Sequence, residues 1–330
     1  MSIVAGMLLC SCGTPTYYTH QGFAEGTSYK IVYESESGTD YEQDIVQLLH
    51  DFSASLSIYM PHSLISRVNK NDSTAVIDDY FRTVFEKSVE INKASNGVFD
   101  ITVAPLVNFW GFGFTSDIPD ADRKKIDSLL QYVGMDKIRI SGNRVVKDSP
   151  GVMLDMNAIA KGYSVDVVAD FLRKKGCRNY LVEIGGEIVA RGVNASEKVW
   201  RVGIDKPADK AMPGAELQAI VQLKDKAMAT SGNYRRFFEI DGAKYAHTID
   251  IKTGYPVRHN LLSATIFASD CMKADAWATV CMVSGLEKSI EHLKRHPELD
   301  ALLIYSDEQG NYREFVTDGL KESVDINSVF

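Results

Sequence analysis

The chain has few cysteines, and it lacks the patterns in which cysteine usually carries a function. It contains five among 330 residues. None of Cys177, Cys271 and Cys281 lies in a Cys-x-x-Cys pair or in a Cys/His spacing typical of metal sites. An odd number of thiols in the body of the chain also argues against a disulfide framework. We therefore expect these three residues to be small buried side chains.

Positive charge is also scarce. The sequence has 36 Lys and Arg against 44 Asp and Glu, a formal net charge of -8, and it has no run of basic residues. Because phosphate binding needs a basic surface, this balance argues against a nucleic-acid partner. The chain also lacks a repeat of fixed period and a low-complexity tract. The G-x-G-x-x-G fingerprint is missing too, which disfavours an oxidoreductase with a Rossmann-type dinucleotide site.

The N-terminus carries an apolar run at residues 3–9 that is too short to cross a bilayer. Such a run, followed by small residues, is typical of a secretory signal. Leu9-Cys10-Ser11-Cys12 resembles the bacterial lipoprotein processing site, which would make Cys12 the lipid-modified first residue. The alternative is an ordinary buried N-terminal strand. We expect a signal and processing region over residues 1–12, a short tether over 13–24, and one folded unit over 25–330.

The spacing of apolar residues predicts a mixture of helices and strands. Helices are expected over 41–56, 79–94, 120–133, 161–175, 274–283 and 286–295. Strands are expected over 27–33, 152–154, 180–184, 188–191, 200–204, 218–223, 236–240, 263–267 and 301–305, with residues 205–214 as the most loop-like internal segment. Because the order lacks regular βαβ alternation, it predicts an α+β fold of mixed sheets and packed helices, either one unit or two closely joined subdomains.

Four polar segments within apolar sequence are candidates for a functional site, and two of them lie in the first half of the chain. Residues 97–113 place an Asp and a Thr in an apolar run ahead of an aromatic cluster with glycines, which suits either a flat-ring pocket or a core strand and an aromatic turn. In the second segment, Asp155 precedes a small-residue turn and a predicted helix, where backbone amides can receive a ligand and Lys161 can neutralise a phosphate. The alternative is a helix capped by Asp155 or Asn157, with Lys161 in solvent.

The third polar segment contains His247, between two strand-like pieces and after a Ser/Gly/Asn loop. An imidazole can take a hydroxyl proton at neutral pH, although a lone histidine is more often buried and bonded to backbone. In the fourth segment, Asp275 and Thr279 lie one helical turn apart. Two hard oxygens with small alanines between them suit Mg²⁺, and the alternative is a hydrogen bond from Thr279 to Asp275 within the helix. Because the rest of this helix is apolar, the carboxylate is expected to face inward.

These segments together resemble the ApbE-type FAD:protein FMN transferases. The resemblance runs from about Gly26 to the predicted strand at 301–305. It rests on seven motifs in order: Gly26-Thr27, GVFDITVAPLVNFWGFG, LDMNAIAKGYSVD, YLVEIGGEIVARG, ATSGNYRR, HTIDIKTGYPV and ADAWAT. The chain departs from the family pattern at Glu25, where the family usually has Met, and at Ile251, where it commonly has Pro.

The resemblance implies a site and an activity. Mg²⁺ would be held by the side chains of Asp275 and Thr279 and by the carbonyl of Ala158. FAD, the substrate, would contact a second set of residues: Glu25, Tyr59, Val98, Phe99, Asp100, Asp155, Lys161 and Ile249. His247 is our candidate base for the acceptor hydroxyl, and AMP would leave.

The resemblance also implies a partner and a location. The acceptor would be a Thr or Ser of a membrane respiratory protein, such as a Na⁺-pumping or electron-transfer subunit. The enzyme would lie on the periplasmic face of the bacterial inner membrane, anchored through lipid at Cys12. Two rival functions remain open: a FAD pyrophosphatase, in which water replaces the protein hydroxyl, and a lipoprotein that binds FAD without chemistry.

Overall fold

The computed structural model describes residues 15–113, 123–207, 216–233, 237–240 and 243–325; the side chains of residues 237–246 are not described. The expected signal region, including Cys12, lies outside these residues, as does most of the expected loop at 205–214. No helix in the described parts is both long and apolar enough to cross a membrane.

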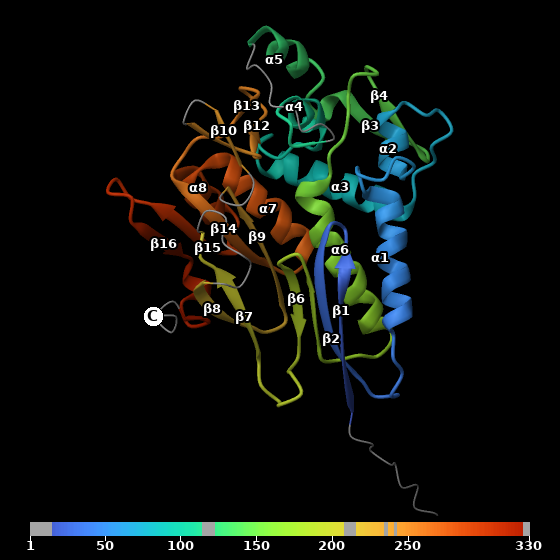
Figure 1. Ribbon diagram of the computed structural model, residues 1–330, viewed down its shortest axis with the longest axis vertical. Helices are drawn as coiled ribbons and strands as arrows, with labels where there is room; N and C mark the ends of the chain where they lie inside the picture. The colour runs from blue at the N-terminus through green and yellow to red at the C-terminus, as the bar shows by residue number, and fades with distance from the viewer. Residues whose placement is uncertain (1–14, 114–122, 208–215, 234–236, 241–242, 326–330) are drawn as a thin grey trace, which may run out of the picture.

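An eight-stranded antiparallel sheet forms the centre of the molecule (Figure 1). Its strand order is β1-β2-β5-β6-β9-β14-β15-β16. These strands span Thr16–Ala24 (β1), Thr27–Ser35 (β2), Tyr180–Ile184 (β5), Glu187–Arg191 (β6), Lys226–Gly232 (β9), Leu261–Ala268 (β14), Asp300–Ser306 (β15) and Tyr312–Val316 (β16).

Four smaller sheets surround this central sheet. They consist of β3 (Ile138–Ser141) with β4 (Arg144–Lys147), β10 (Phe237–Ile240) with β11 (Ala243–Ala246), β12 (Ile249–Asp250) with β13 (Tyr255–Pro256), and β7 (Trp200–Asp205) with β8 (Leu217–Leu223) and β17 (Val324–Asp325).

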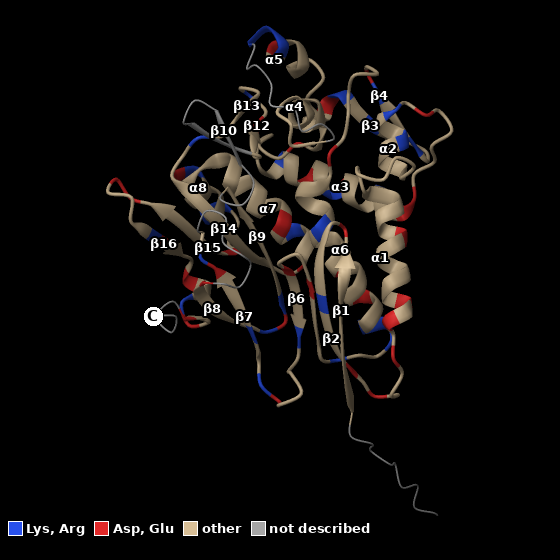
Figure 2. Cartoon of the chain, in the orientation of Figure 1, with Lys and Arg blue, Asp and Glu red and all other residues tan. Residues whose placement is uncertain are grey.

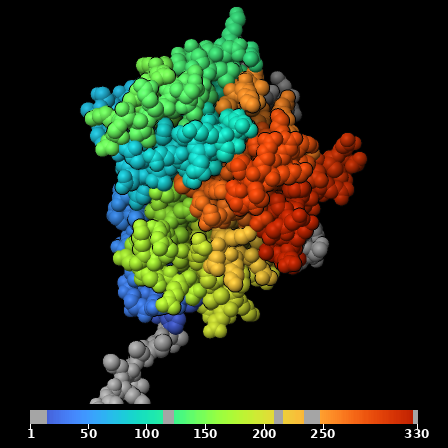
Figure 3. Space-filling model, turned by 180° about the vertical axis from the view of Figure 1, so that it is seen from behind, coloured from blue at the N-terminus to red at the C-terminus, as the bar shows by residue number. Residues whose placement is uncertain are grey.

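Helices α6 and α7 pack on one face of the central sheet and against each other. The helices are α1 (Glu42–Leu56), α2 (Leu64–Asn69), α3 (Asp79–Ala94), α4 (Ala104–Phe109), α5 (Arg123–Leu130), α6 (Asn157–Lys174), α7 (Cys271–Ser284) and α8 (Leu286–Arg295). Helix α1 contacts α6, and α3 contacts both α6 and α7. Seen from behind, the cyan segment that includes α3 lies against the orange-red C-terminal segment (Figure 3).

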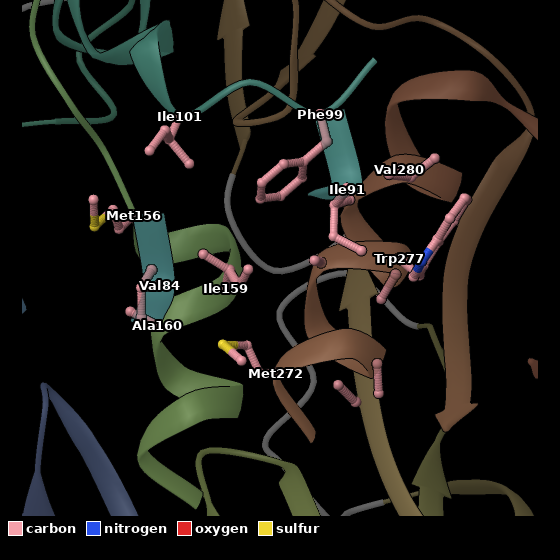
Figure 4. Packing of buried hydrophobic residues seen from close by; sticks show 14 of the residues in the cluster. Val84, Ile91, Phe99, Ile101, Met156, Ile159, Ala160, Met272, Trp277 and Val280 are labelled. Carbon is pink, nitrogen blue, oxygen red and sulfur yellow. The ribbon is translucent and has the colours of Figure 1, made fainter. Parts of the chain in front are cut away.

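Strand β9 shows how the central sheet separates two cores. Met228 packs with the apolar side chains of β7 and β8. Its neighbours Ala227 and Ala229 face the helices instead, because successive side chains of a strand point to opposite faces. On the helix side, α6, α7, α3 and the segment after α3 share one apolar cluster, seen around Ile159, Met272, Trp277 and Phe99 in Figure 4. Helix α7 is thus buried on nearly all sides, and a polar group on it needs a partner.

The mixed α+β architecture is confirmed. Two predicted helices, 79–94 and 286–295, have the bounds of α3 and α8, and 41–56 differs from α1 by one residue. The start of the folded chain is earlier than expected, since Thr16–Ala24, within the expected tether, pairs along its whole length with β2.

Two expectations for the middle of the chain are wrong: a strand and the start of a helix. Residues 152–154 do not form a strand, because the backbone N–H and carbonyl of Leu154 bond to the side chain of Asn69 at 2.7 and 2.8 Å. The helix expected from Lys161 begins at Asn157, so Ala158 lies in its first turn rather than in a turn before it.

Candidate functional site

Helices α6 and α7 cross at Gly162. A Cβ atom at this position would lie 2.4 Å from the carbonyl oxygen of Cys271 and 2.7 Å from Cβ of Asp275. Only glycine fits such a distance without moving one helix, so the two backbones meet directly. This close approach brings the N-terminal part of α6 to the side chain of Asp275.

Asp275 lies at this crossing as a buried carboxylate, 4% exposed. Its Oδ2 accepts a hydrogen bond of 2.9 Å from the backbone N–H of Gly162. In a regular helix that N–H points to the carbonyl four residues earlier, which is Ala158. The structure therefore brings the Asp275 carboxylate to the part of α6 where the Ala158 carbonyl lies.

Thr279 follows Asp275 by one turn and is partly exposed. Both residues belong to the described part of the chain, and no hydrogen bond joins the Thr279 hydroxyl to Asp275 there. The alternative of an internal Thr-to-Asp bond thus does not hold in this structure. The carbonyl oxygen of Ala158 and the side-chain oxygens of Asp275 and Thr279 therefore belong to one region, and oxygen is the ligand atom that Mg²⁺ prefers.

Lys161 lies beside Asp275 and pairs with an acidic residue that the sequence did not single out. Its Nζ is 3.1 Å from Oε2 of Glu187, which is 3% exposed. Glu187 is the first residue of β6, directly after Gly185-Gly186. In the sequence, this glutamate stands between two apolar strands, and an acidic residue that is buried there needs a compensating partner. Lys161 is ion-paired rather than solvated. Charged positions of both signs meet in the centre of the molecule, where α6 and α7 cross (Figure 2).

Glu25 brings a third carboxyl group to Lys161. It occupies the turn between β1 and β2 with φ of 54°, and its Oε2 accepts a hydrogen bond of 3.0 Å from the Ser164 hydroxyl. Among the described residues, no hydrogen-bond donor reaches the buried Oε1 of Glu25. One ammonium group is thus shared by the carboxyl groups of Glu25, Glu187 and Asp275.

Burial raises the pKa of every carboxyl group in this cluster, and repulsion from Asp275 adds to this effect at Glu25 and Glu187. Burial, with the nearby Asp275, raises the pKa of Glu25 to about 7 and that of Glu187 to about 8. Burial also raises the pKa of Asp275 to about 6, against the opposing effects of Lys161 and the Gly162 N–H. Burial alone would lower the pKa of Lys161, but Glu187, Asp275 and Glu25 outweigh it and raise that pKa. The cluster carries an excess of acid and takes up protons near neutral pH.

The raised pKa of Glu25 predicts how stability depends on pH. Its folded-state pKa of about 7 exceeds the ordinary 4.5, so the folded state binds more protons between these values. The free energy of unfolding therefore falls as pH rises through this window. In Glu25→Gln this loss is absent, and without metal or FAD we expect the variant to gain on the order of 2 kcal/mol over the wild type between pH 5 and pH 8. Melting temperatures at both pH values measure the gain.

Glu197 supplies a matched control for this variant. It is exposed and also lies in a turn with positive φ, at 57°. Glu197→Gln should leave the pH dependence of the melting temperature unchanged. Parallel curves for Glu25→Gln and the wild type from pH 5 to pH 8 would contradict the assignment of Glu25.

The excess of carboxyl groups over ammonium groups fits a divalent cation at the point where α6 and α7 cross. Asp275 uses one carboxylate oxygen for Gly162 and keeps Oδ1 available, and the buried Oε1 of the neighbouring Glu25 has no hydrogen-bond partner among the described residues. Buried carboxylates need a cation or several donors. Elsewhere in the described chain, His20, Asp40 and Glu42 lie close enough to share an ion. These three pair with each other, with His20 Nε2 2.9 Å from Asp40 and Nδ1 3.5 Å from Glu42.

The expected FAD residues near 97–113 divide into two groups. Phe99 is 2% exposed and its side chain packs in the core (Figure 4), and Asp100 bonds to Thr102 and to the N–H of Met135. Both side chains therefore serve the local fold, and the segment is a short 3-10 helix followed by α4 rather than a strand. Val98 is partly buried, whereas Tyr59 is 55% exposed and presents its ring to solvent.

Two further expected FAD residues, Asp155 and Ile249, are both buried. Asp155 Oδ1 accepts a hydrogen bond of 2.8 Å from the N–H of Asn157, the first residue of α6, but the N-cap itself is Met156 and no side chain caps it, so the capping alternative is wrong. Ile249 lies in β12 and packs in a cluster with Leu106 and Trp110. Trp110 Nε1 donates to the carbonyl of Gly254 at 2.8 Å, which ties the aromatic segment to the β12–β13 hairpin.

His247 precedes this hairpin and is half-buried. Its ring lies edge-on to Phe112, with 6.3 Å between ring centroids. The next residue, Thr248, donates a hydrogen bond of 2.9 Å to Asn233, at the end of β9. Since α7 packs on β9, the His247 segment is attached to the end of the strand on which the helix of Asp275 packs. In Figure 1, β12, β13 and α4 lie on the side of the molecule where α6 begins.

Comparison with known proteins identifies the family of the chain. The model of the ApbE family matches residues 26–303. A FAD:protein FMN transferase of Vibrio cholerae is 34% identical over 97% of this chain and 97% of its own length.

Two solved structures have the same fold. The flavin transferase ApbE from Vibrio cholerae aligns with a TM-score of 0.83 and 33% identity over 94% of this chain and 99% of its own. The flavinyl transferase ApbE of Pseudomonas stutzeri aligns with a TM-score of 0.82 and 30% identity over 94% and 97%. Because the family model spans most of the chain and the similarity extends over nearly its whole length, this protein belongs to the ApbE family.

Proposed function

We propose that this protein is a Mg²⁺-dependent FAD:protein FMN transferase that joins FMN through a phosphoester bond to a Thr or Ser of an acceptor protein and releases AMP. The observation that carries the proposal is the buried Asp275 carboxylate, which bonds to the Gly162 N–H in the second turn of α6, beside Lys161. Such a site offers both negative charge for a metal and positive charge for a phosphate. The names of the relatives support the transfer reaction.

The residues present fit Mg²⁺ at the helix crossing. Asp275 and Thr279 would hold the ion through side-chain oxygens, and Ala158 through the second lone pair of its carbonyl. When bound there, the ion would neutralise charge on the FAD pyrophosphate. The excess of carboxyl groups over ammonium groups in the cluster supports this assignment.

Lys161 is our candidate for binding a pyrophosphate oxygen. Glu187 and Glu25 hold its ammonium group in place and keep it protonated, so its charge is fixed before the substrate arrives. Glu25 would in addition accept a hydrogen bond from the adenosine half of FAD through Oε1, which has no protein donor among the described residues. Tyr59 offers an exposed ring on which the flavin can stack.

The remaining assigned residues shape the FAD site. Val98 lines it with a partly buried side chain. Phe99, Asp100, Asp155 and Ile249 contribute through the backbone segments that their side chains fix. These segments come from the aromatic region, the start of α6 and the β12–β13 hairpin.

His247 is our candidate base. It would take the proton from the acceptor hydroxyl as the oxygen attacks the phosphorus on the FMN side. A new phosphorus–oxygen bond to the acceptor forms, the bond to the AMP phosphate breaks, and AMP leaves. The half-buried position of the imidazole beside Phe112 supports this role, because a partly enclosed histidine keeps its orientation.

We further propose that the protein is exported and works on the periplasmic face of the inner membrane. The apolar segment 3–9 and Cys12 support export and a lipid anchor. A membrane respiratory protein would then be the acceptor, since its flavin-bearing segment would lie on the same side.

Transfer is tested by incubating the protein with FAD, Mg²⁺ and a candidate acceptor, followed by intact-mass measurement. We expect the acceptor to gain the mass of one FMN less water, and its Thr→Ala or Ser→Ala variant to gain nothing. Free FMN and AMP without an adduct would instead show a pyrophosphatase, and intact FAD after incubation would show a binding protein.

A further inference from the structure

A carboxylate of α6 holds the N-terminus of α7. Asp166 follows Gly162 by one turn on the same face of α6. Its Oδ1 accepts a hydrogen bond of 2.8 Å from the N–H of Cys271, and its Oδ2 accepts one of 2.8 Å from the N–H of Met272. These are the first two residues of α7, whose amides have no partner within their own helix.

The next amide of α7 is satisfied differently. The N–H of Lys273 donates at 2.8 Å to Asp270, the residue that caps this helix from its own chain. Asp270 therefore stabilises α7 but does not tie it to α6. Asp166 does both, because its carboxylate belongs to the neighbouring helix.

Both helices carry proposed Mg²⁺ ligands, and Asp166 fixes the position of one relative to the other. Asp275 is one turn beyond Cys271, and Ala158 is one turn before Gly162. If α7 slid or rotated, Asp275 would lose the Gly162 N–H and separate from Ala158. Gly162 allows the close approach of the helices and bonds to Asp275 one turn into α7, whereas Asp166 holds the first two amides of α7.

We propose that Asp166 is a positioning residue that sets the register of α7 on α6 and thereby the geometry of the metal ligands. This inference rests on the proposed Mg²⁺ site. Residues that orient metal ligands from outside the coordination shell affect metal affinity strongly, typically by 10- to 100-fold. The Asp166 carboxylate acts here through two backbone N–H groups rather than through a ligand side chain.

The test measures Mn²⁺ binding in place of Mg²⁺, in the presence of FAD and without acceptor, from the electron paramagnetic resonance signal of free Mn²⁺. In Asp166→Asn we expect Mn²⁺ binding about 10-fold weaker than in the wild type, because one of the two acceptor oxygens is replaced by a donor. Asp166→Ala should weaken it further. FAD affinity in EDTA, followed by flavin fluorescence, should stay within about twofold, since the metal geometry is changed and the flavin site is not.

Asp270→Asn is the matched control, because it weakens the same helix end without touching α6. It should lower the melting temperature like Asp166→Asn but keep Mn²⁺ affinity within about twofold. Equal losses of Mn²⁺ affinity in both variants, or unchanged affinity in Asp166→Asn, would overturn the positioning role while the metal site stands. A wild type that binds no Mn²⁺ with FAD would overturn the proposed metal site itself, and the inference with it.

Discussion

Replacing Asp275 by asparagine is expected to lower the rate of FMN transfer about a thousandfold, which corresponds to about 4 kcal/mol of transition-state stabilisation. The amide keeps the size of the carboxylate but not its charge, and charge is what a divalent cation requires at this position. It also leaves Lys161 paired only with Glu187 and Glu25. Transfer rates over a range of Mg²⁺ concentrations measure the effect.

The fold should survive this change. Removing a buried negative charge from a cluster with excess acid relieves repulsion, so the melting temperature of Asp275→Asn without metal should not fall below that of the wild type. This stability measurement separates loss of the site from unfolding. Transfer within tenfold of the wild type, with the same Mg²⁺ dependence, would remove Asp275 from the metal site.

Replacing His247 by alanine is expected to lower FMN transfer by a factor of about 100 to 10,000, the usual contribution of a positioned general base. FAD binding should stay within about threefold, because the imidazole acts on the acceptor hydroxyl and not on FAD. Single-turnover transfer measured by intact mass, beside FAD titration by flavin fluorescence, separates the two quantities.

His50 provides the comparison for this variant. It is an exposed histidine of α1 whose imidazole lies 3.5 Å from Asp51, and His50→Ala should transfer like the wild type. A His247→Ala variant with the wild-type transfer rate would show that another group takes the proton. Loss of FAD affinity in parallel with the rate would instead assign His247 to substrate binding.

The helices of the fold were predictable where an amphipathic pattern and local capping agree. Helix α3 is an example, since it begins at the Asp78 cap and has a clear apolar face. The start of α6 was not predictable in the same way, because Ala158-Ile159-Ala160 fits both a turn of small residues and a helix. The decisive contacts are tertiary: Asp155 supports the N–H of Asn157, and the backbone of α7 packs on Gly162.

The residues of the site also divide into those that the sequence predicted and those that it did not. Motif order pointed to Asp275, Lys161 and Ala158, and the structure brings their segments together at one helix crossing. Glu187 and Asp166 act through partners about 26 and 105 positions away along the chain, and a single sequence gives no sign of such contacts. Phe99 lies inside a motif but packs in the core. A motif in the sequence does not tell a residue that contacts a ligand from one that packs in the core.

The pairing of β2 with β5 has a consequence for how the chain reaches its native state. Tyr29 lies opposite Ile184, so the N-terminal hairpin finds its neighbour only after the whole segment that carries α1 to α6 has been synthesised. Until then β2 presents an unpaired edge to other nascent chains. Because closing so long a loop costs entropy before any strand contact repays it, we expect slow folding, limited by this closure rather than by helix formation.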